Sequence, residues 1–488
     1  MTSNNGRSIS VAVVGGGIGG IAAATMLKRA GYHDVTVFER NAGLGGVWHT
    51  NTYPGAACDV PSHFYEFSFA PNPEWSRRYA PQPEIKAYLE RVVRDHGVES
   101  AFRFGTEVRS ARWDKRGQWV LDTSTGDHVA DVLIAACGQL STPKYPAIEG
   151  LDGFEGPTFH TAQWRHDVDL TDRRVAVIGS GCSAAQVVPA IQSQAAALDV
   201  YQRSPGWTMP RMDYEYSARA KRLFRRFPLL QRLDRKSVQA IMEFGAIAMT
   251  RRQWMLAPLK AVGRRRIRKA IQDPALREAV TPTDQFGCKR VMVSDDWYPA
   301  LAKPNVRLIA GGVEQVTATG VVGGDGVERP ADVLILATGF KSHDFVAPME
   351  IRGVDGRTLA EEWTDTPKAY LGLSVPAFPN MFLLYGPNTN GGTGSVVFTV
   401  EAGMHHVLAA LAELNRTGER QIEIRSEVAE QFHRELREAL PGTVWTGCGN
   451  WYLDENGHSP NQWPWRWGTY DRRTRRLEPG AYLVGDNC

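Results

Sequence analysis

Short apolar runs and small-residue helical segments alternate in two separate parts of the chain. In the first part, an apolar run at residues 10–14 precedes a glycine turn, an alanine-rich helical segment through Ala30 and a second apolar run, VTVFE. The same order returns after residue 174, where RVAVI precedes a glycine turn, a helical segment through about Ala195 and the run DVYQ. Apolar runs that alternate with helical segments are typical of parallel sheets covered by helices. The pattern therefore predicts an α/β fold that contains two β-α-β units.

The rest of the pattern divides the chain into five parts. A helical segment from Pro83 to His96 belongs to the first domain, to which the last hundred residues return through NMFLL and a helix that begins near Val396. The stretch after Trp207 lacks strand-like alternation, is rich in Arg, Leu and Ala, and is predicted to be a helical insertion. The predicted parts are residues 1–145 and 343–488 for the first domain, 146–206 and 286–342 for the second, and 207–285 for the insertion.

Both glycine turns have the spacing of a dinucleotide fingerprint. A tight glycine turn lets backbone N–H groups approach a pyrophosphate, and the positive end of the following helix stabilises its charge. A single G-x-G-x-x-G also occurs in glycine turns without a ligand, but here each copy lies within a complete strand, turn, helix and strand. The pattern therefore predicts two Rossmann-like dinucleotide-binding domains. The fingerprint positions are Gly15, Gly17 and Gly20 in the first domain and Gly179, Gly181 and Ala184 in the second.

One residue distinguishes the two predicted sites. The strand after the first fingerprint ends in Glu39, whereas the strand after the second is followed by Arg203. An acid at this position accepts hydrogen bonds from the free hydroxyls of an adenosine ribose, and an arginine pairs with a 2′-phosphate. Glu39 therefore indicates FAD or NAD, and Arg203 indicates NADP.

Composition and cysteine spacing argue against several classes of protein. The 488-residue chain has 56 Lys and Arg against 53 Asp and Glu, a balance that gives no general signal for nucleic-acid binding. The polar start MTSNNGRS is not a signal peptide, and no apolar run is expected to approach the roughly 18 residues of a membrane span, so a cytoplasmic protein is predicted. The six cysteines contain no C-x-x-C pair, which disfavours a metal site and the dithiol of the disulfide reductases that carry both fingerprints.

The predicted insertion concentrates positive charge. Residues 207–282 hold 18 basic and 6 acidic side chains. Two interpretations stay open: the basic side chains are the solvated faces of helices, or they form a membrane-surface patch that presents an apolar substrate. Nucleic-acid binding is disfavoured, because the charge is confined to one segment without a recognition motif. We expect the insertion to lie beside the active site, so that apolar residues such as Phe244 and Trp254 influence substrate access.

Three further segments resemble the signatures of one enzyme family. FEGPTFHTAQW, from Phe154 to Trp164, resembles the F-x-G-x-x-x-H-x-x-x-W signature of type I Baeyer–Villiger monooxygenases. GGVWHTNTYPGAACD, from Gly45 to Asp59, matches that family's G-G-x-W-x(4)-[FY]-P-G-x(3)-D pattern, and GCKRVMVSDDWYPAL resembles its C-K-R segment. The first signature departs from the usual Pro or Asp at Arg165. The ending NWYLDENGHSPNQWPW resembles the hydroxyacetophenone-monooxygenase-like subgroup, and the whole resemblance covers nearly the full chain.

The resemblance implies a class B flavoprotein monooxygenase that binds FAD and NADPH and uses O2 to convert ketones into esters or lactones through a C4a-peroxyflavin. In this family the residue that matches Arg290 stabilises negative charge beside the flavin, and the acid that matches Asp59 is its counter-ion. Lys289 matches a second contact to the 2′-phosphate of NADPH, next to Arg203 and Ser204. The other implied cofactor-binding residues are Arg40, Gly46, Trp48, Tyr65, Val108, Thr338, Gly339 and Asn388.

Two other functions fit the fingerprints. A related flavin-containing monooxygenase would oxygenate amines or sulfides, although Trp164 at the end of the signature favours the Baeyer–Villiger side. A flavin-binding redox sensor would bind the nucleotides without oxygenase turnover. Within the signature, His160 is interpreted as a hydrogen-bonding linker between the nucleotide domains rather than as a general base. The YGPNTNGGTGS loop before Val396 is interpreted as leading into a helix whose N-terminus faces the flavin.

Overall fold

Two five-stranded parallel sheets form the frame of the molecule, in a computed structural model that describes residues 8–485. The first sheet has the order β19 (Met381–Leu383), β7 (Val132–Ala135), β1 (Val11–Val14), β2 (Val35–Phe38) and β3 (Phe102–Arg103). The second has the order β8 (Thr158–His160), β17 (Val333–Leu336), β9 (Arg174–Ile178), β10 (Ala197–Gln202) and β13 (Val306–Ala310). Each fingerprint strand, β1 or β9, therefore lies in the middle of its sheet, and the predicted α/β fold is confirmed.

Smaller sheets connect distant parts of the chain. The pairings of β19 with β7 and of β18 with β4 show that the chain after residue 343 returns to the first sheet region, as the apolar pattern predicted. These sheets are β18 (Glu350–Arg352), β4 (Val108–Trp113), β5 (Trp119–Thr123) and β6 (Gly126–Ala130); β14 (Val313–Val316), β15 (Gly320–Gly323) and β16 (Glu328–Pro330); β11 (Thr208–Met209) with β12 (Met292–Val293); and β20 (Ile422–Ile424) with β21 (Tyr482–Val484).

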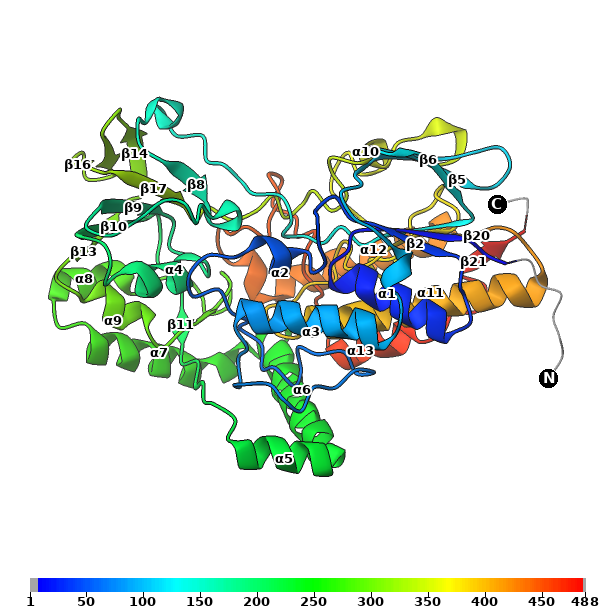
Figure 1. The fold of residues 1–488 in the computed structure, drawn as a ribbon, viewed down its shortest axis with the longest axis horizontal. Coiled ribbons are helices and arrows are strands. Elements are labelled where there is room, and N and C mark those ends of the chain that lie inside the picture. Colours follow the sequence, from blue (N-terminus) through cyan, green and yellow to red (C-terminus); the bar gives the residue numbers. More distant parts are fainter. Residues whose placement is uncertain (1–7, 486–488) are drawn as a thin grey trace.

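Helices cover both parallel sheets (Figure 1). In the first, α1 (Ile18–Arg29) packs against α3 (Gln82–Asp95) and α11 (Val396–Thr417), and α11 also contacts α13 (Trp467–Thr474). In the second, α4 (Ala184–Ile191) packs against α9 (Trp297–Leu301). Helix α4 ends before the predicted Ala195, but the Ala195 N–H still donates to the Ile191 carbonyl, so a bonded turn continues. Shorter or peripheral helices are α2 (Val47–Thr50), α10 (Leu359–Glu362) and α12 (Ser426–Ala439).

Helix α11 corrects one expectation. No apolar run was expected to approach the length of a membrane span, yet within residues 8–485 this helix is long and apolar enough to cross a membrane by length and composition. The helix was overlooked because Glu401 and Glu413 interrupt its apolar residues, and Arg416 is its only other Lys, Arg, Asp or Glu. The buried residues of α11, among them Val400, Met404, Val407 and Leu411, belong to the hydrophobic core of the first sheet. Packing in the core of the first domain therefore accounts for the apolar composition of α11.

The predicted insertion is mostly helical from Ala218 to Val280, after the short strand β11. It contains α5 (Ala218–Arg226), α6 (Pro228–Thr250), α7 (Ala257–Ala270) and α8 (Pro274–Val280). In Figure 1, α5 and the adjoining end of α6 protrude below the rest of the chain, and α7 runs along the same lower edge. Helix α6 contacts α13 of the first domain, whereas α7 and α8 contact α9 and β13 of the second. The segment therefore bridges both nucleotide-binding halves.

Candidate active site

A cavity of about 1660 Å³ lies at the carboxyl ends of the central strands of both sheets. Its walls include Val14 at the end of β1 and Ile178 at the end of β9. Ser395 and Val396, at the N-terminus of α11, also line the cavity, and the contact of this helix end with the flavin stays a prediction. In open parallel sheets, ligands bind at the carboxyl edge of the strands.

The two fingerprint turns have the same geometry. Gly15 has a φ of +111°, and a Cβ atom there would lie 2.5 Å from the carbonyl oxygen of Ala136. Gly179 has a φ of +116°, and its Cβ would lie 2.4 Å from the carbonyl oxygen of Ala337. A side chain at either position would collide with the carbonyl group of the neighbouring segment. Glycine has no side chain and adopts this positive φ readily. Both backbones are therefore open to a pyrophosphate, and the residues present fit two dinucleotides.

The last position of each fingerprint acts by packing. Gly20 and Ala184 do not line the cavity. A Cβ at Gly20 would lie 1.9 Å from the Gly15 carbonyl oxygen, so the glycine permits close contact between α1 and the turn before it. Ala184 is fully buried at the start of α4.

Glu39 is fixed at the first turn by backbone donors. The Gly16 N–H donates to Glu39 Oε2 at 2.7 Å, and the Asn41 N–H donates to Oε1 at 2.8 Å. The carboxylate lines the cavity next to the pyrophosphate turn. Its position is the one from which an acid accepts hydrogen bonds from ribose hydroxyls.

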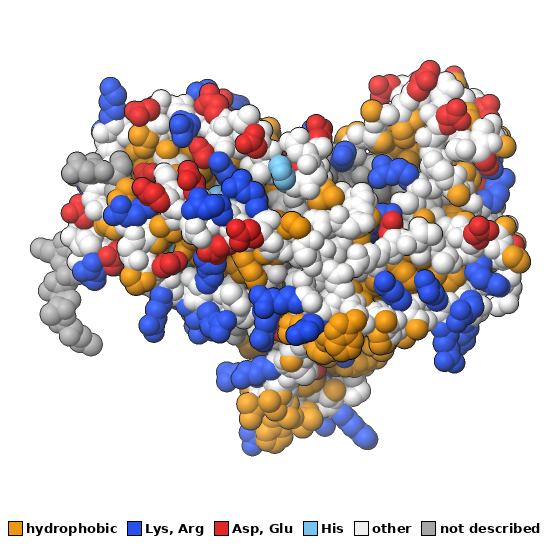
Figure 2. Space-filling view, turned by 180° about the vertical axis from the view of Figure 1, so that it is seen from behind, with side chains coloured by type: hydrophobic (Ala, Val, Ile, Leu, Met, Phe, Trp, Pro, Cys, Tyr) orange, Lys and Arg blue, Asp and Glu red, His pale blue; other side chains and the backbone are white. Residues whose placement is uncertain are grey.

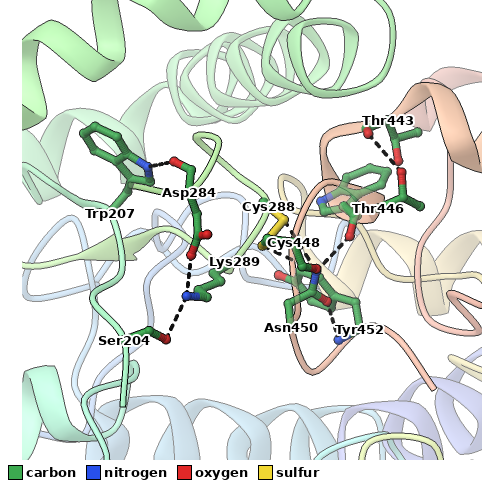
Figure 3. The surroundings of a disulfide bond; sticks show 11 residues. Ser204, Trp207, Asp284, Cys288, Lys289, Thr443, Thr446, Cys448, Asn450 and Tyr452 are labelled. Carbon is green, nitrogen blue, oxygen red and sulfur yellow. Dashed lines mark hydrogen bonds and ion pairs between the residues drawn. A yellow bond between two sulfur atoms is a disulfide. The ribbon is translucent and has the colours of Figure 1, made fainter. Parts of the chain in front are cut away.

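Cationic side chains gather at the second turn. Arg203 follows β10, is exposed and lines the cavity. The Lys289 ammonium donates to the Ser204 hydroxyl, with Nζ 2.8 Å from Oγ, and forms an ion pair with Asp284 (Figure 3). Asp284 compensates part of the Lys289 charge, whereas no described residue forms an ion pair with Arg203. Arg203 is therefore the more available cation for a phosphate.

Arg290 and Asp59 meet inside the cavity. The Arg290 Nη2 atom lies 2.6 Å from Asp59 Oδ2, and both residues line the cavity wall. The Asp59 carboxylate holds the pKa of Arg290 well above its usual value, although burial acts in the opposite direction. An arginine withdrawn from water needs such a counter-ion. The pair therefore presents a fixed positive charge to the cavity.

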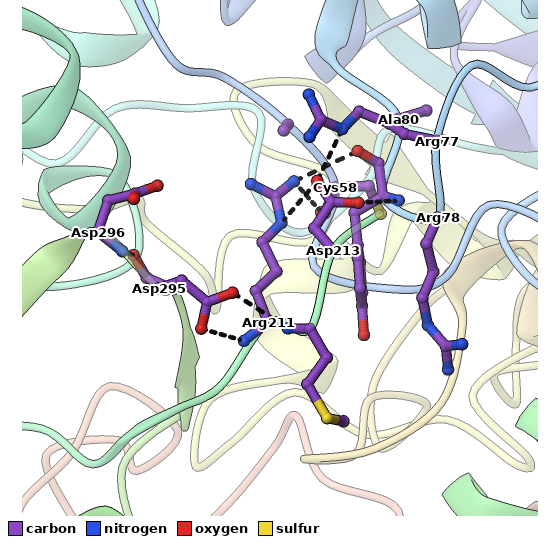
Figure 4. Close-up of polar contacts among 12 residues, drawn as sticks. Cys58, Arg77, Arg78, Ala80, Arg211, Asp213, Asp295 and Asp296 are labelled. Atoms are coloured by element: carbon purple, nitrogen blue, oxygen red, sulfur yellow. Dashed lines mark hydrogen bonds and ion pairs between the residues drawn. The ribbon is translucent and has the colours of Figure 1, made fainter. Parts of the chain in front are cut away.

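Arg211, which was not among the predicted site residues, holds the chain next to Asp59. Arg211 Nη2 donates to the carbonyl oxygens of Cys58 at 3.2 Å and Tyr79 at 3.4 Å. Its backbone N–H donates to the Asp295 carboxylate at 3.1 Å, so Arg211 joins three distant segments (Figure 4). No motif marks this arginine, because its partners are mostly backbone carbonyls.

Cys288 and Cys448 form a disulfide that the cysteine spacing did not indicate (Figure 3). The two residues are 160 positions apart. The bond joins the segment that carries Arg290 to the C-terminal segment, where Asn450 Nδ2 donates to the carbonyl oxygens of Trp445 and Cys448. Residues 449–451 line the cavity. The disulfide therefore fixes part of the cavity wall next to Arg290.

The cavity brings together most of the predicted site residues. Trp48 Nε1 donates to the Tyr65 hydroxyl at 3.1 Å, which fixes both rings at the wall. Asn388 does not line the cavity; its Nδ2 donates to the carbonyl oxygens of Ser459 and Gln462 and so holds the C-terminal segment. The predicted residues that line the cavity are Gly15, Gly17, Glu39, Arg40, Gly46, Trp48, Asp59, Tyr65, Val108, Gly179, Gly181, Arg203, Ser204, Lys289, Arg290, Thr338 and Gly339.

His160 is fully buried at the end of β8 and does not line the cavity. Its Nδ1 accepts a hydrogen bond from the Ala162 N–H at 3.1 Å. Burial lowers the pKa of His160. This placement supports a structural role rather than proton transfer to a substrate, and the link between the two domains stays a prediction.

The expected influence of Phe244 and Trp254 on substrate access is not supported. Their side chains are 59% and 73% exposed, and neither lines the cavity. Helix α6 approaches the cavity at Gly245, where a Cβ would lie 2.8 Å from Cγ2 of the cavity residue Thr393. The helical pattern of the insertion did not determine the direction of the Phe244 side chain on α6 or of Trp254, which follows α6.

The chain is similar to Baeyer–Villiger monooxygenases over nearly its whole length. It is 41% identical to one from Streptomyces coelicolor over 480 residues, which cover 98% of this chain and 92% of the relative. It is also 41% identical to one from Pseudomonas aeruginosa over 481 residues, which cover 98% of this chain and 91% of the relative. A family model described as pyridine nucleotide-disulphide oxidoreductase matches residues 12–243, which include both fingerprints.

Solved structures agree with this relationship. An oxidized steroid monooxygenase bound to NADP superposes with a TM-score of 0.87 at 31% identity, covering 98% of this chain and 100% of that structure. A cyclohexanone monooxygenase from Rhodococcus sp. Phi1 bound to NADP+ superposes with a TM-score of 0.87 at 28% identity, covering 98% and 99%. The hydroxyacetophenone-monooxygenase-like subgroup stays a prediction. The chain belongs to the Baeyer–Villiger monooxygenases and is an FAD- and NADPH-dependent flavin monooxygenase.

Proposed function

We propose that this enzyme converts ketones into esters or lactones with O2 and NADPH. The observation that carries the proposal is the Arg290–Asp59 pair on the wall of the cavity that both fingerprints share. FAD, when bound, supplies hydride acceptance and oxygen activation, which no side chain of the protein provides.

Arg290 supplies the charge that a carbonyl reaction needs. When a nucleophile attacks a ketone, the carbonyl oxygen gains negative charge. A guanidinium that is already oriented stabilises this charge without reorganisation of solvent. Asp59 keeps the guanidinium oriented, since its Oδ2 lies 2.6 Å from one of the two terminal nitrogens of Arg290.

The two ends of the cavity select the nucleotides. Glu39 at the first turn accepts hydrogen bonds from an unphosphorylated adenosine ribose, which suits FAD. Arg203, Ser204 and Lys289 at the second turn offer two cations and a hydroxyl to the 2′-phosphate of NADPH. Arg290 lines the same cavity as both turns, so its charge would act on the reacting ends of the two nucleotides when they are bound there.

A screen of ketones, amines and thioethers with the purified holoenzyme under ¹⁸O2 tests the proposal. We expect the rate of NADPH oxidation to rise when a ketone is added. One molecule of ester should form for each NADPH consumed, and each ester should carry one ¹⁸O atom. Oxygenation of amines or thioethers without ester from any ketone would assign the enzyme to the other reaction class. Flavin reduction without any oxygenated product would indicate a redox sensor.

A further inference from the structure

Exposed apolar side chains are concentrated on α5, α6 and α7. Of the 18 large apolar side chains exposed among residues 8–485, 10 lie within residues 218–270, here called the α5–α7 surface. Trp254, between α6 and α7, is 73% exposed. Figure 2 shows apolar side chains at the tip of the protruding lower part of the molecule and along the edge beside it. Such a concentration marks an interaction surface.

Helix α6 has two apolar stripes. One, which includes Val238, Ala246 and Met249, is buried against the rest of the chain. A helix that only packs against the core needs a single apolar stripe. The second stripe recurs at spacings of three, eight and three residues, so its members share one face of the helix. Its residues, Leu230, Leu233, Ile241 and Phe244, are all exposed.

Helix α5 and the residue that follows it have the same division. Leu223, in α5, and Phe227, directly after α5, are exposed. Phe224 points inward and packs edge-on against the His63 ring, with the centroids 4.8 Å apart. The inward contact fixes α5, and the outward pair extends the exposed stripe of α6 toward the tip of the protrusion.

The α5–α7 surface is strongly basic. Residues 218–270 hold 16 Lys and Arg against 2 Asp and Glu. The whole chain has 56 Lys and Arg and 53 Asp and Glu, so the rest of the chain holds 40 basic and 51 acidic side chains. In Figure 2 the basic side chains flank the apolar tip. A basic surface with an apolar centre complements an anionic interface and is not explained by the composition of the rest of the chain.

The surface is held rigidly on the first domain. Gln231 Nε2 donates to the buried Glu66 carboxylate at 2.8 Å, and Arg235 Nη1 donates to the Glu66 carbonyl oxygen at 2.6 Å. Arg235 also forms an ion pair with Glu401 of α11 at 3.4 Å. The outward side chains of α6 are therefore presented on a fixed base, and contact with a partner requires no folding of the segment.

We propose that the α5–α7 surface docks on an anionic lipid bilayer. Phe227 and Leu229, at the start of α6, enter the headgroup region, and the surrounding Lys and Arg side chains contact lipid phosphates. A second copy of the chain fits the surface less well. A symmetric dimer would place this surface against itself, and 16 basic side chains would then face 16 others across the contact. The docking does not depend on the proposed reaction.

Co-sedimentation of the FAD-loaded, full-length protein with lipid vesicles tests the docking. Vesicles of phosphatidylcholine alone are compared with vesicles that contain equal parts of phosphatidylcholine and phosphatidylglycerol, at low and at high salt. We expect the protein to sediment with the mixed vesicles, and binding to weaken several-fold at high salt. Binding to phosphatidylcholine alone is expected to be much weaker.

Two double variants separate the apolar and the basic contributions. Phe227→Ser/Leu229→Ser removes apolar contacts, and Arg222→Glu/Arg226→Glu reverses two charges; each is expected to lower binding to the mixed vesicles about tenfold or more. Val129→Ser/Val327→Ser, at exposed apolar positions elsewhere, and Arg434→Glu/Arg437→Glu, on α12, are matched controls with wild-type binding. All four variants should keep their FAD and their NADPH oxidation, which separates lost docking from lost folding or activity.

Two outcomes would overturn the docking. The first is equal or absent sedimentation with both vesicle types, because the proposal requires anionic lipid. The second is a lipid-free dimer, detected by analytical ultracentrifugation, that Phe227→Ser/Leu229→Ser abolishes. That result would assign the α5–α7 surface to a second copy of the chain.

Discussion

Arg290 and Asp59 are 231 positions apart in the chain, yet Arg290 Nη2 lies 2.6 Å from Asp59 Oδ2. The pair brings a residue of the segment after the insertion against the end of a loop in the first domain. Both residues face the cavity, so the relative placement of the two domains decides whether the guanidinium is oriented.

Replacement of Arg290 should separate flavin reduction from oxygen transfer. Arg290→Ala removes the positive charge that stabilises the carbonyl adduct, but it leaves both fingerprint turns intact. We expect FAD binding and reduction by NADPH to persist, and ester formation to fall about a hundredfold or more, with oxygen released as hydrogen peroxide. Ester and peroxide per NADPH consumed are the quantities to measure. A wild-type ester yield would show that Arg290 is not the catalytic arginine.

Replacement of Asp59 should cause a smaller loss of the same kind. Asp59→Asn keeps the shape of the side chain but removes the charge that orients Arg290. We expect ester per NADPH to fall roughly tenfold, because loss of an orienting partner usually leaves part of the activity. The same assay measures it, with Asp127→Asn as an exposed control carboxylate outside the cavity lining. A loss as large as that of Arg290→Ala would mean that Asp59 itself contacts the reacting groups.

The two nucleotide turns could be predicted from the sequence, because their requirements are local. Gly15 and Gly179 each adopt a positive φ beside the carbonyl of a neighbouring strand, and the short spacing of the fingerprint encodes this geometry. The Arg290–Asp59 pair could be anticipated only through the family resemblance. Nothing in the spacing of two residues 231 positions apart indicates that they meet.

Other features depend on the direction of side chains, which periodicity does not determine. Helix α6 carries a buried and an exposed apolar stripe, and both satisfy helical spacing. Phe244 was therefore expected near the substrate, although it faces outward. The Cys288–Cys448 bond escaped prediction for a similar reason, since the fold alone brings the two thiols together.

Arg203 should decide between NADPH and NADH. Its exposed guanidinium is positioned at the second turn to pair with a 2′-phosphate, which NADH lacks. We expect Arg203→Ala to weaken NADPH binding roughly ten- to a hundredfold and to leave NADH binding nearly unchanged. Stopped-flow flavin reduction over a range of nucleotide concentrations measures both, with Arg203→Lys as a variant that keeps the charge. Equal weakening of both nucleotides would remove Arg203 from the phosphate site.

His406 should make the protein less stable in acid. Burial lowers the pKa of His406 to about 4, from an ordinary value of 6.5, and its Nε2 lies 2.6 Å from the Tyr482 hydroxyl. Between these two pKa values the unfolded chain binds a proton that the folded chain excludes, so stability is complete above pH 6.5 and falls toward pH 4. The slope contributed by His406 approaches ~1.4 kcal/mol per pH unit.

Urea unfolding of wild type and His406→Gln across this pH range isolates that contribution. Glutamine keeps an amide that can bond to Tyr482 and does not titrate. We expect the free energy of unfolding to fall less steeply with decreasing pH in the variant. Burial also lowers the pKa of His433 to about 4, so a residual slope persists in both proteins. Parallel curves would show that His406 does not titrate differently in the folded state.

The Cys288–Cys448 bond should hold the cavity wall in place beside Arg290. Reduction of protein purified without reductant is expected to release two additional thiols, and Cys448→Ser should abolish that increase. Because the bond spans 160 positions, its loss should lower the free energy of unfolding by roughly 2–5 kcal/mol.

Loss of the disulfide should also affect the active site. Residues 449–451 would lose their covalent tether to the Arg290 segment, so water would enter the cavity more readily and more hydrogen peroxide would form per NADPH. Thiol titration, urea unfolding and peroxide yield measure the three effects, with reduced wild type as the matched control. If Cys448→Ser and reduced wild type both keep the wild-type peroxide yield, the disulfide stabilises the fold without shaping the active site.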